Sequence, residues 1–344
     1  MVTTRAGART TRLKVAHFGS IGLDLMSLVA EYLIKSQPLA WTATAALTNR
    51  ELAEVIRPKI RALQLASTLR YVRSYGSFNM GRQALRTGNR LWCADMNNHR
   101  VCGFALPPKG SSPSSASTPV TIQGFEYPWF LASDPSAREL FVAETSGSRI
   151  SVYDATDGRK LRDWPMRRGD NLVWTQGIAV YSGELYAARP EERCITVHDT
   201  CSGAVVRRWR VDFDGHFGVS LCMIDGLIFV TRPDRASHGG VVVFMRDGTL
   251  YDDNFGGGRM ERPTGVCALG DRFVCVARLA NGRSPEVAIF SRDGKTLIRR
   301  HMLTRSSPIQ GVNPVLISAD DEFLYVNTVV SVAAIAHGAA ALSH

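Results

Sequence analysis

The residues best suited to chemistry in this sequence stand close together, at Asp95, Asn98, His99 and Arg100. An acid beside an imidazole and a guanidinium is a combination that can transfer protons. The same spacing also suits a structural role, because an aspartate that ends one strand can pair with an arginine that starts the next. A second candidate is the triple glycine at 256–258, which resembles a phosphate cradle. It lacks a following Gly-Lys-[Ser/Thr] and a helix, so we expect a linker turn there.

The elements that carry these residues recur along the chain with a fixed period. An aromatic residue or its equivalent ends an alternating strand in six successive units, with steps of 49, 45, 46, 46 and 46 residues; these positions are Phe104, Tyr153, His198, Phe244, Phe290 and Ala336. A turn glycine follows with steps of 45, 45, 46 and 44 residues, at Gly158, Gly203, Gly248, Gly294 and Gly338. Two independent markers with one period indicate a repeat protein.

Each unit has the pattern of three or four short strands joined by tight turns. Asp-Gly pairs at 157–158, 247–248 and 293–294 separate alternating runs, which is a strong hairpin signal. A four-stranded unit of about 45 residues is the size of a propeller blade. We therefore predict an all-β, six-bladed β-propeller over residues 67–344, with a flexible Pro/Ser-rich loop at 107–119. The last unit lacks a strand, and we expect residues 69–75 to supply it and close the ring.

The first unit contains the run Leu-Trp-Cys-Ala-Asp-Met-Asn-Asn-His-Arg-Val at 91–101. This run resembles the signature of NHL repeats, and the glycine turn at 255–258 with its Pro-x-Gly continuation at 263–265 is similar to that family's linkers. The resemblance covers about residues 69–344 and implies a six-bladed propeller. In that family the positions of Asp95, Asn98, His99 and Arg100 are mostly structural, so the resemblance favours the pairing role over catalysis.

Propellers usually bind ligands at the mouth of the central channel, where one blade leads into the next. The residues that we place at this mouth, as a partner-binding site, are Arg82, Glu126, Gln176, His216, Arg262 and Asn313. A metal site needs several histidines or carboxylates that converge, and this set has one of each. Amidating-lyase-like propellers use several histidines and lactonase-like ones use Glu, Asn and Asp. The set matches neither, so we expect no catalytic residues, no metal and no cofactor.

The N-terminal fifth of the chain has a different pattern. We expect a disordered basic tail at 1–19 and a small α-helical module at 20–66, since apolar residues recur there at helical spacing. The module resembles an F-box, with adaptor-binding candidates at Leu23, Leu25, Met26, Val29, Leu33 and Pro38. The resemblance implies a Skp-type adaptor as partner; the alternative is an unnamed helical cap. The composition of residues 1–23 also fits a mitochondrial transit peptide.

The net charge of +10 suggests RNA as a rival ligand. Residues 1–66 carry nine Lys or Arg and four acids, a net charge of +5, so the propeller region is only mildly basic. Some NHL domains bind RNA through a basic face, where cations meet phosphates and aromatic rings stack on bases. The candidates for this role are Arg207, Arg208, Trp209 and Arg210.

The function that these observations favour is a non-enzymatic interaction protein, whose propeller recognises a protein partner. It would serve as the substrate receptor of an SCF-type ubiquitin ligase if the F-box resemblance holds. RNA binding is the alternative, and a propeller hydrolase or lyase is the third class. Seven cysteines without a C-x-x-C pair indicate reduced thiols in an intracellular protein, cytoplasmic or nuclear. No apolar run is long enough to span a bilayer, so we expect no membrane partner.

Overall fold

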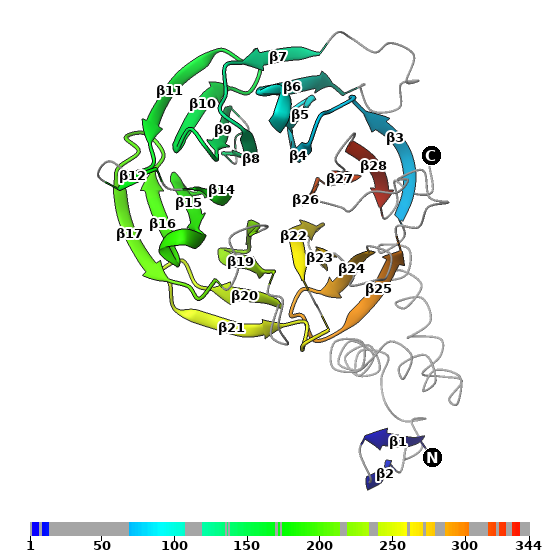
Figure 1. Ribbon diagram of the computed structural model, residues 1–344. Helices are drawn as coiled ribbons and strands as arrows, with labels where there is room; N and C mark the ends of the chain where they lie inside the picture. The colour runs from blue at the N-terminus through cyan, green and yellow to red at the C-terminus, as the bar shows by residue number, and fades with distance from the viewer. Residues whose placement is uncertain are drawn as a thin grey trace.

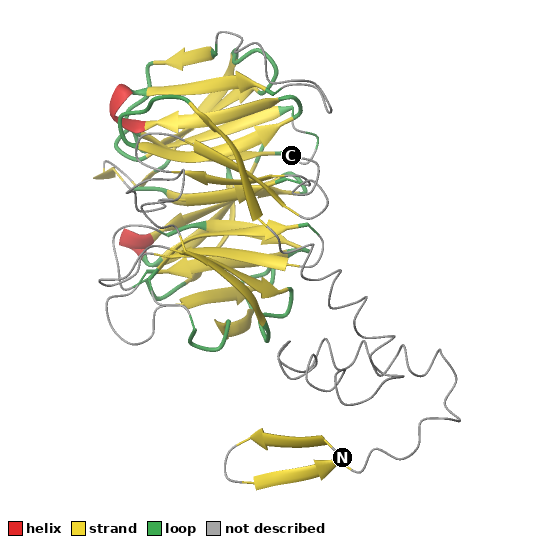
Figure 2. Cartoon of the chain, turned by 90° about the vertical axis from the view of Figure 1, so that its right-hand side faces the viewer, coloured by secondary structure: helices red, strands yellow, loops and turns green. Residues whose placement is uncertain are grey.

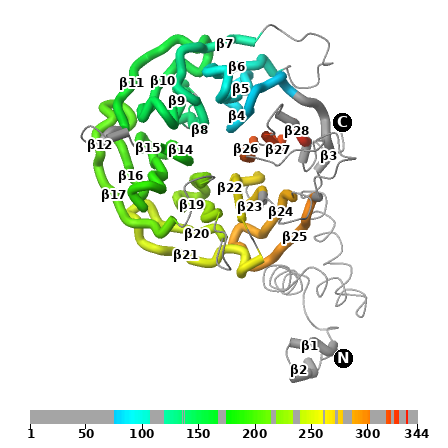
Figure 3. Tube along the Cα trace, viewed as in Figure 1, coloured from blue at the N-terminus to red at the C-terminus, as the bar shows by residue number. Residues whose placement is uncertain are grey.

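The computed structural model describes residues 2–6, 9–13, 69–106, 119–134, 136, 138–168, 171–172, 174–213, 219–233, 240–259, 262–270, 273–278, 286–302, 316–320, 323–327 and 332–337. Six four-stranded antiparallel sheets stand around a common axis (Figure 1). The chain passes once around the ring, as the colour sequence in Figure 3 shows. The predicted six-bladed β-propeller is therefore confirmed.

Each blade runs outward from an inner strand beside the axis to an outer strand at the rim. Blade 1 consists of β4 (Gly81–Thr87), β5 (Arg90–Asp95), β6 (Arg100–Ala105) and β7 (Val120–Gln123). Blade 2 consists of β8 (Pro128–Ser133), β9 (Glu139–Glu144), β10 (Arg149–Asp154) and β11 (Lys160–Pro165). Blade 3 consists of β14 (Gln176–Tyr181), β15 (Glu184–Arg189), β16 (Cys194–Asp199) and β17 (Val205–Arg210).

The second half of the ring repeats this order. Blade 4 consists of β18 (Leu221–Ile224), β19 (Leu227–Arg232), β20 (Gly240–Phe244) and β21 (Leu250–Phe255). Blade 5 consists of β22 (Pro263–Leu269), β23 (Phe273–Arg278), β24 (Glu286–Ser291) and β25 (Leu297–Met302). Blade 6 consists of β26 (Leu316–Ala319), β27 (Phe323–Asn327), β28 (Val332–His337) and β3 (Leu69–Tyr75).

Blade 6 joins the two ends of the propeller region. Strand β3 pairs antiparallel with β28, so that Tyr75 lies opposite Val332 and Leu69 lies opposite His337. This pairing supplies the fourth strand of the last blade from the segment before the first blade, as predicted. It removes the exposed edge that an open ring would leave.

The turn glycines that mark the repeat have a packing role between blades. A Cβ at Gly248, where φ is +92°, would lie 2.7 Å from the Trp209 ring of blade 3. Gly203 has a positive φ and meets the Trp164 ring of blade 2 in the same way. Only glycine has the backbone freedom and the space that this contact needs, so the hairpins of blades 3, 4 and 5 each seat an outer-strand aromatic residue of the preceding blade. In blade 2, Gly158 instead meets the aliphatic side chains of Val120 and Ile122. The period seen in the sequence is thus the period of a contact between blades.

Two further predictions concern the N-terminal region. Strands β1 (Val2–Ala6) and β2 (Arg9–Leu13) form an antiparallel hairpin in the segment for which the sequence predicted a disordered tail. Their Thr-rich sequences favour extended structure. The predicted helical module at 20–66 lies outside the described residues, among which there is no α-helix. The predicted loop at 107–119 also lies outside them, apart from Pro119.

Candidate functional site

The starts of the inner strands and the turns between the second and third strands share one face of the disc. We name it the η face, because it carries the two short 3-10 helices η1 (Met96–Asn98) and η2 (Pro190–Glu192). Figure 2 shows both on the same side of the disc. The opposite side carries the Asp-Gly hairpins, and we name it the hairpin face. The channel mouth predicted from the sequence belongs to the η face.

The side chains around Asp95 on the η face hold β5, β6 and the turn between them together, and we call this set of contacts a staple. The Asp95 carboxylate is fully buried and accepts hydrogen bonds from the Asn79 backbone N–H at 2.8 Å and from Asn98 Nδ2 at 2.8 Å. Arg100 Nε donates to its second oxygen at 2.7 Å, and this bond raises the pKa of Arg100. The predicted pairing across the hairpin is confirmed. His99 Nδ1 lies 3.1 Å from the Phe125 carbonyl oxygen, so its ring also serves local structure.

Blade 2 repeats this staple with glutamate in place of aspartate. The buried Glu144 carboxylate accepts from Arg149 Nε at 2.7 Å and from Ser151 Oγ at 2.8 Å. The backbone N–H of Glu126 donates to it at 2.7 Å. A carboxylate bonded by this many donors is held in place and is not available to abstract a proton from a ligand. Asp95 and Glu144, which end the second strands of blades 1 and 2, are therefore structural.

Blade 3 reverses the charges at the same position. Arg189 ends β15 where the first two blades have an acid, and its side chain is buried. Its Nη1 lies 3.4 Å from Glu192 Oε2, and its Nη2 donates to the Met166 carbonyl oxygen at 3.4 Å. An ion pair is thus kept in blade 3, but its acid belongs to η2 and not to the start of the third strand.

Arg82 is a cation at the channel mouth. It follows the first residue of β4, and its Cζ stands 3.8 Å from the ring centroid of Trp129 on β8. Its Nε donates to Met96 Sδ at 3.4 Å. Among the described residues no carboxylate pairs with it, and burial lowers the pKa of Arg82 to about 10. The guanidinium therefore stays charged at neutral pH, half-buried and stacked on an indole.

The other residues predicted at the mouth have different surroundings. Glu126 is exposed, and Arg262 has a φ of +51° in the turn that precedes β22. Gln176 is fully buried, and its Oε1 accepts from the Val219 backbone N–H at 3.2 Å, which links blades 3 and 4. Gln83 makes the same link from blade 1 to Leu131 of blade 2, at 2.9 Å. His216 and Asn313 lie outside the described residues.

Metal binding has no visible site in the part of the chain that the structure describes. Nowhere in it do three or more His, Cys, Asp or Glu side chains come together in a group that could hold an ion. Five of the seven cysteines are buried in strands, and all seven are free thiols. No helix of the described residues is long and apolar enough to cross a membrane.

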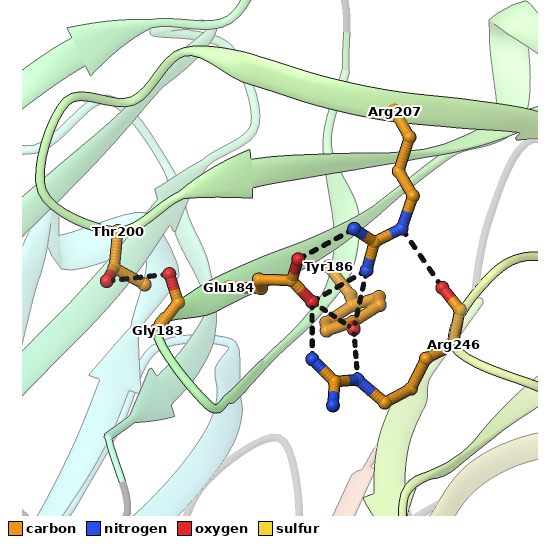
Figure 4. A network of polar contacts seen from close by, with 6 residues as sticks. All are labelled: Gly183, Glu184, Tyr186, Thr200, Arg207 and Arg246. Atoms are coloured by element: carbon orange, nitrogen blue, oxygen red, sulfur yellow. Dashed lines mark hydrogen bonds and ion pairs between the residues drawn. The ribbon is translucent and has the colours of Figure 1, made fainter.

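The RNA-binding candidates of β17 divide into two pairs. Arg207 makes two bonds of 2.6 Å to the Glu184 carboxylate, which Arg246 also contacts at 2.9 Å (Figure 4). Trp209 packs against Gly248 and Phe244 of blade 4. Arg208 and Arg210 are exposed. RNA binding stays a prediction, and of the four candidates only Arg208 and Arg210 have side chains turned to solvent.

Sequence reasoning missed Trp129, which completes the Arg82 stack. Nothing in the repeat marks this position, because the equivalent inner-strand positions of other blades are not aromatic. The one available signal was its place beside Pro128 at the start of an inner strand. The adaptor-binding candidates Leu23, Leu25, Met26, Val29, Leu33 and Pro38 all lie outside the described residues.

Comparison with known proteins supports the propeller fold. No family model matches the chain, and no curated protein matches its sequence. Its shape is similar to a gluconolactonase from Xanthomonas campestris, with a TM-score of 0.57 and 16% identity over 80% of this chain and 92% of that one. Hydrazine synthase from Kuenenia stuttgartiensis gives 0.51 and 13%, over 73% and 74%. A protein of unknown function from Bacteroides thetaiotaomicron gives 0.55 and 12%, over 77% and 72%.

These comparisons correct the function expected from the sequence. A non-enzymatic interaction protein that serves a ubiquitin ligase was inferred largely from the propeller and the helices before it. Propellers of this shape include a gluconolactonase and a hydrazine synthase, so the fold does not point to that role. No finding supports a ligase receptor, and that function is withdrawn. The low identities establish the propeller fold and leave the activity to be argued from the site.

Proposed function

We propose that this chain is an NHL-type propeller that binds an anionic ligand at the channel mouth of the η face, through Arg82. The observation that carries the proposal is the environment of the Arg82 side chain. It is half-buried, it stacks on Trp129 at 3.8 Å, and no described carboxylate neutralises it. Taking an ionised group out of water is unfavourable unless an opposite charge or hydrogen bonds replace the water. A bound anion would supply both.

The geometry of Arg82 favours a carboxylate or a phosphate. An arginine presents a planar fork of N–H donors that matches two oxygens of either group. Nε is occupied by Met96 Sδ, which leaves the two terminal nitrogens for the ligand. Contact with the Trp129 ring at 3.8 Å restricts the Arg82 side chain, so less conformational entropy is lost when an anion binds.

The NHL identity rests on the two staples of blades 1 and 2. Asp95 with Arg100, and Glu144 with Arg149, place an acid at the end of the second strand and an arginine at the start of the third. The sequence run at 91–101 was the basis of the resemblance, and its side chains make the contacts that such a signature needs. The reversed pair in blade 3 explains why the signature fades after the second unit.

We also propose that binding is not followed by chemical conversion of the ligand. The acids that end the second strands of blades 1 and 2, Asp95 and Glu144, are engaged by three or more donors each, whereas Glu126 is exposed. A general base has to reach the proton that it removes, and these two groups cannot do so without breaking the staples.

The test is calorimetric titration of the full chain with benzoate, with inorganic phosphate and with benzamide. Benzamide has the shape of benzoate without its charge. We expect at least one anion to bind with a Kd of about 1 mM, which is ordinary for a fragment of this size. Benzamide should bind at least tenfold more weakly. Arg82→Met should abolish anion binding, whereas Arg159→Gln, at an exposed arginine of blade 2, should leave it unchanged.

Two results would overturn the proposal. Equal binding of benzoate by the wild type and by Arg82→Met, or no binding of either anion at 10 mM, would remove Arg82 from the function. The claim of no conversion is tested separately, by following gluconolactone hydrolysis with and without added Ca²⁺ or Zn²⁺. Turnover by the wild type above the rate of buffer would show that the chain is an enzyme.

A further inference from the structure

Exposed apolar side chains of the described residues concentrate at one part of the rim. Seven large apolar residues are exposed, and five of them belong to blades 3 and 4: Val205, Val206, Met245, Leu250 and Tyr251. Tyr251 is 60% exposed and Val205 is 55% exposed. Single exposed apolar residues are normal, but a cluster indicates a surface that another molecule covers. We name β17, β21 and Met245 together the blade 3–4 rim.

These five residues share one junction between two blades. Arg207 Nε of β17 donates to the Arg246 carbonyl oxygen at 3.1 Å, so the first half of β17 lies against the turn after Met245. Leu250 pairs with Phe244, whose ring centroid is 6.2 Å from that of Trp209 on β17. Figure 1 shows β17 and β21 as successive outer strands of the ring. The apolar residues therefore form one patch across the two outer strands.

The two outer strands carry opposite charges beyond their apolar starts. β17 reads Val-Val-Arg-Arg-Trp-Arg and β21 reads Leu-Tyr-Asp-Asp-Asn-Phe. Arg208 and Asp253 occupy equivalent repeat positions, 45 residues apart, so they lie at the same height on the rim. Both are exposed, and among the described residues neither side chain makes an ion pair. One strand is thus the electrostatic complement of its neighbour.

Each outer strand also has a free edge. β17 and β21 are the last strands of their sheets, so no strand of the described residues pairs with their outer edges. Side chains bond two backbone groups of β21, the Asp253 carbonyl oxygen and the Asn254 N–H. Such an edge accepts another strand readily. Charged side chains usually protect an edge strand, but here the charges of the two strands attract each other.

We infer that the blade 3–4 rim is the interface between two copies of this chain. A two-fold axis between the strands brings β17 of one copy to β21 of the other, and β21 of the first to β17 of the second. Arg208 of each copy then meets Asp253 of the other, and the apolar starts are covered on both copies. An acidic peptide would cover β17 alone and would leave Tyr251 and Asp253 exposed, so a second copy accounts for more of the surface.

Sedimentation equilibrium of the full chain from 1 to 100 µM tests this inference. We expect a reversible dimer for the wild type. Arg208→Glu places a second carboxylate against Asp253, and Asp253→Arg places a second guanidinium against Arg208. Each variant alone should therefore dimerise at least tenfold more weakly. An equimolar mixture of the two variants should regain the wild-type affinity, because both contacts of the mixed dimer are then attractive.

The mixture makes the result independent of folding defects, since a misfolded variant would not be rescued by its counterpart. Arg159→Glu changes the charge of an exposed residue on blade 2 and should dimerise as the wild type does. A wild-type chain that stays monomeric at 100 µM would overturn the inference. So would variants that dimerise as tightly as the wild type, or a mixture that remains monomeric. The anion site of Arg82 is unaffected by any of these outcomes.

Discussion

Two half-buried arginines stand over aromatic rings on opposite faces of this propeller, and their surroundings differ. On the η face, Arg82 stacks on Trp129 without a carboxylate among the described residues. On the hairpin face, Arg207 lies 5.9 Å from the Tyr186 ring and makes two bonds to Glu184. The same residue types thus serve two purposes. An arginine whose donors are filled by a carboxylate joins neighbouring blades, and we propose that the one without a carboxylate binds a ligand.

The charged side chains that are fully hydrogen-bonded within the protein should contribute most to the stability of the ring. Asp95→Ala removes a buried acceptor that holds the Asn79 backbone N–H, the exposed Asn98 amide and the partly exposed Arg100 guanidinium. We expect a loss of about 3 kcal/mol in the free energy of unfolding, from three lost hydrogen bonds of about 1 kcal/mol each. Asp95→Asn keeps one acceptor and should cost about 2 kcal/mol. Urea denaturation measures both, and a loss below about 1 kcal/mol for Asp95→Ala would contradict the structural role.

Glu184 should contribute less than Asp95, and its contribution should depend on pH. Bonds from Arg207, Tyr186 and Arg246 lower the pKa of Glu184 from 4.5 to about 2. A depressed carboxyl pKa stabilises the folded state above the unfolded pKa, and this stability is lost as the pH falls from about 4.5 to about 2. Glu184→Gln should cost about 2–3 kcal/mol at pH 7.

Urea midpoints at pH 7, 4 and 2.5 measure this dependence. The difference between the wild type and Glu184→Gln should shrink as the pH falls, because protonation removes the charge that the variant lacks. A difference that stays constant from pH 7 to 2.5 would show that Glu184 is not held by its arginines.

The charge of Arg82 should destabilise the folded state when no ligand is present, whereas the charge of Glu184 stabilises it. Its lowered pKa means that the folded state disfavours the charge at any pH below about 10. Arg82→Met relieves this cost but loses the stack on Trp129, which is worth about 0.5–2 kcal/mol. We expect a net change within about 1 kcal/mol of the wild type, in either direction. A loss of about 3 kcal/mol would place Arg82 among the structural arginines.

The fold was predictable from the sequence because the spacing of the turn glycines reflects a packing contact that recurs between neighbouring blades. Gly203 and Gly248 each seat a tryptophan of the preceding blade, so they keep their spacing although the rest of the unit varies. The Asp95 staple was predictable for a similar reason, since its partners are close in sequence. The closing strand could be inferred because the last unit lacked one.

The site was only partly predictable, because side-chain direction depends on bulges. Arg82 and Gln176 both stand at the start of an inner strand, and both were placed at the mouth. The register of β4 against β5 shifts between Gly81 and Ala84, whereas that of β14 against β15 shifts between Gln176 and Ile178. An extra residue in a strand redirects the side chains beside it. Arg82 therefore reaches Trp129, and Gln176 points between blades.

The most direct test of the account is the effect of an anion on unfolding. Urea denaturation of the wild type and of Arg82→Met is measured with and without 100 mM benzoate, with benzamide as the uncharged control. For a Kd of about 1 mM, binding to the folded state should stabilise the wild type by about 2.7 kcal/mol. Arg82→Met should gain nothing, and benzamide should stabilise neither. Equal stabilisation of both proteins by benzoate would contradict the claim that the unpaired arginine is the ligand-binding group.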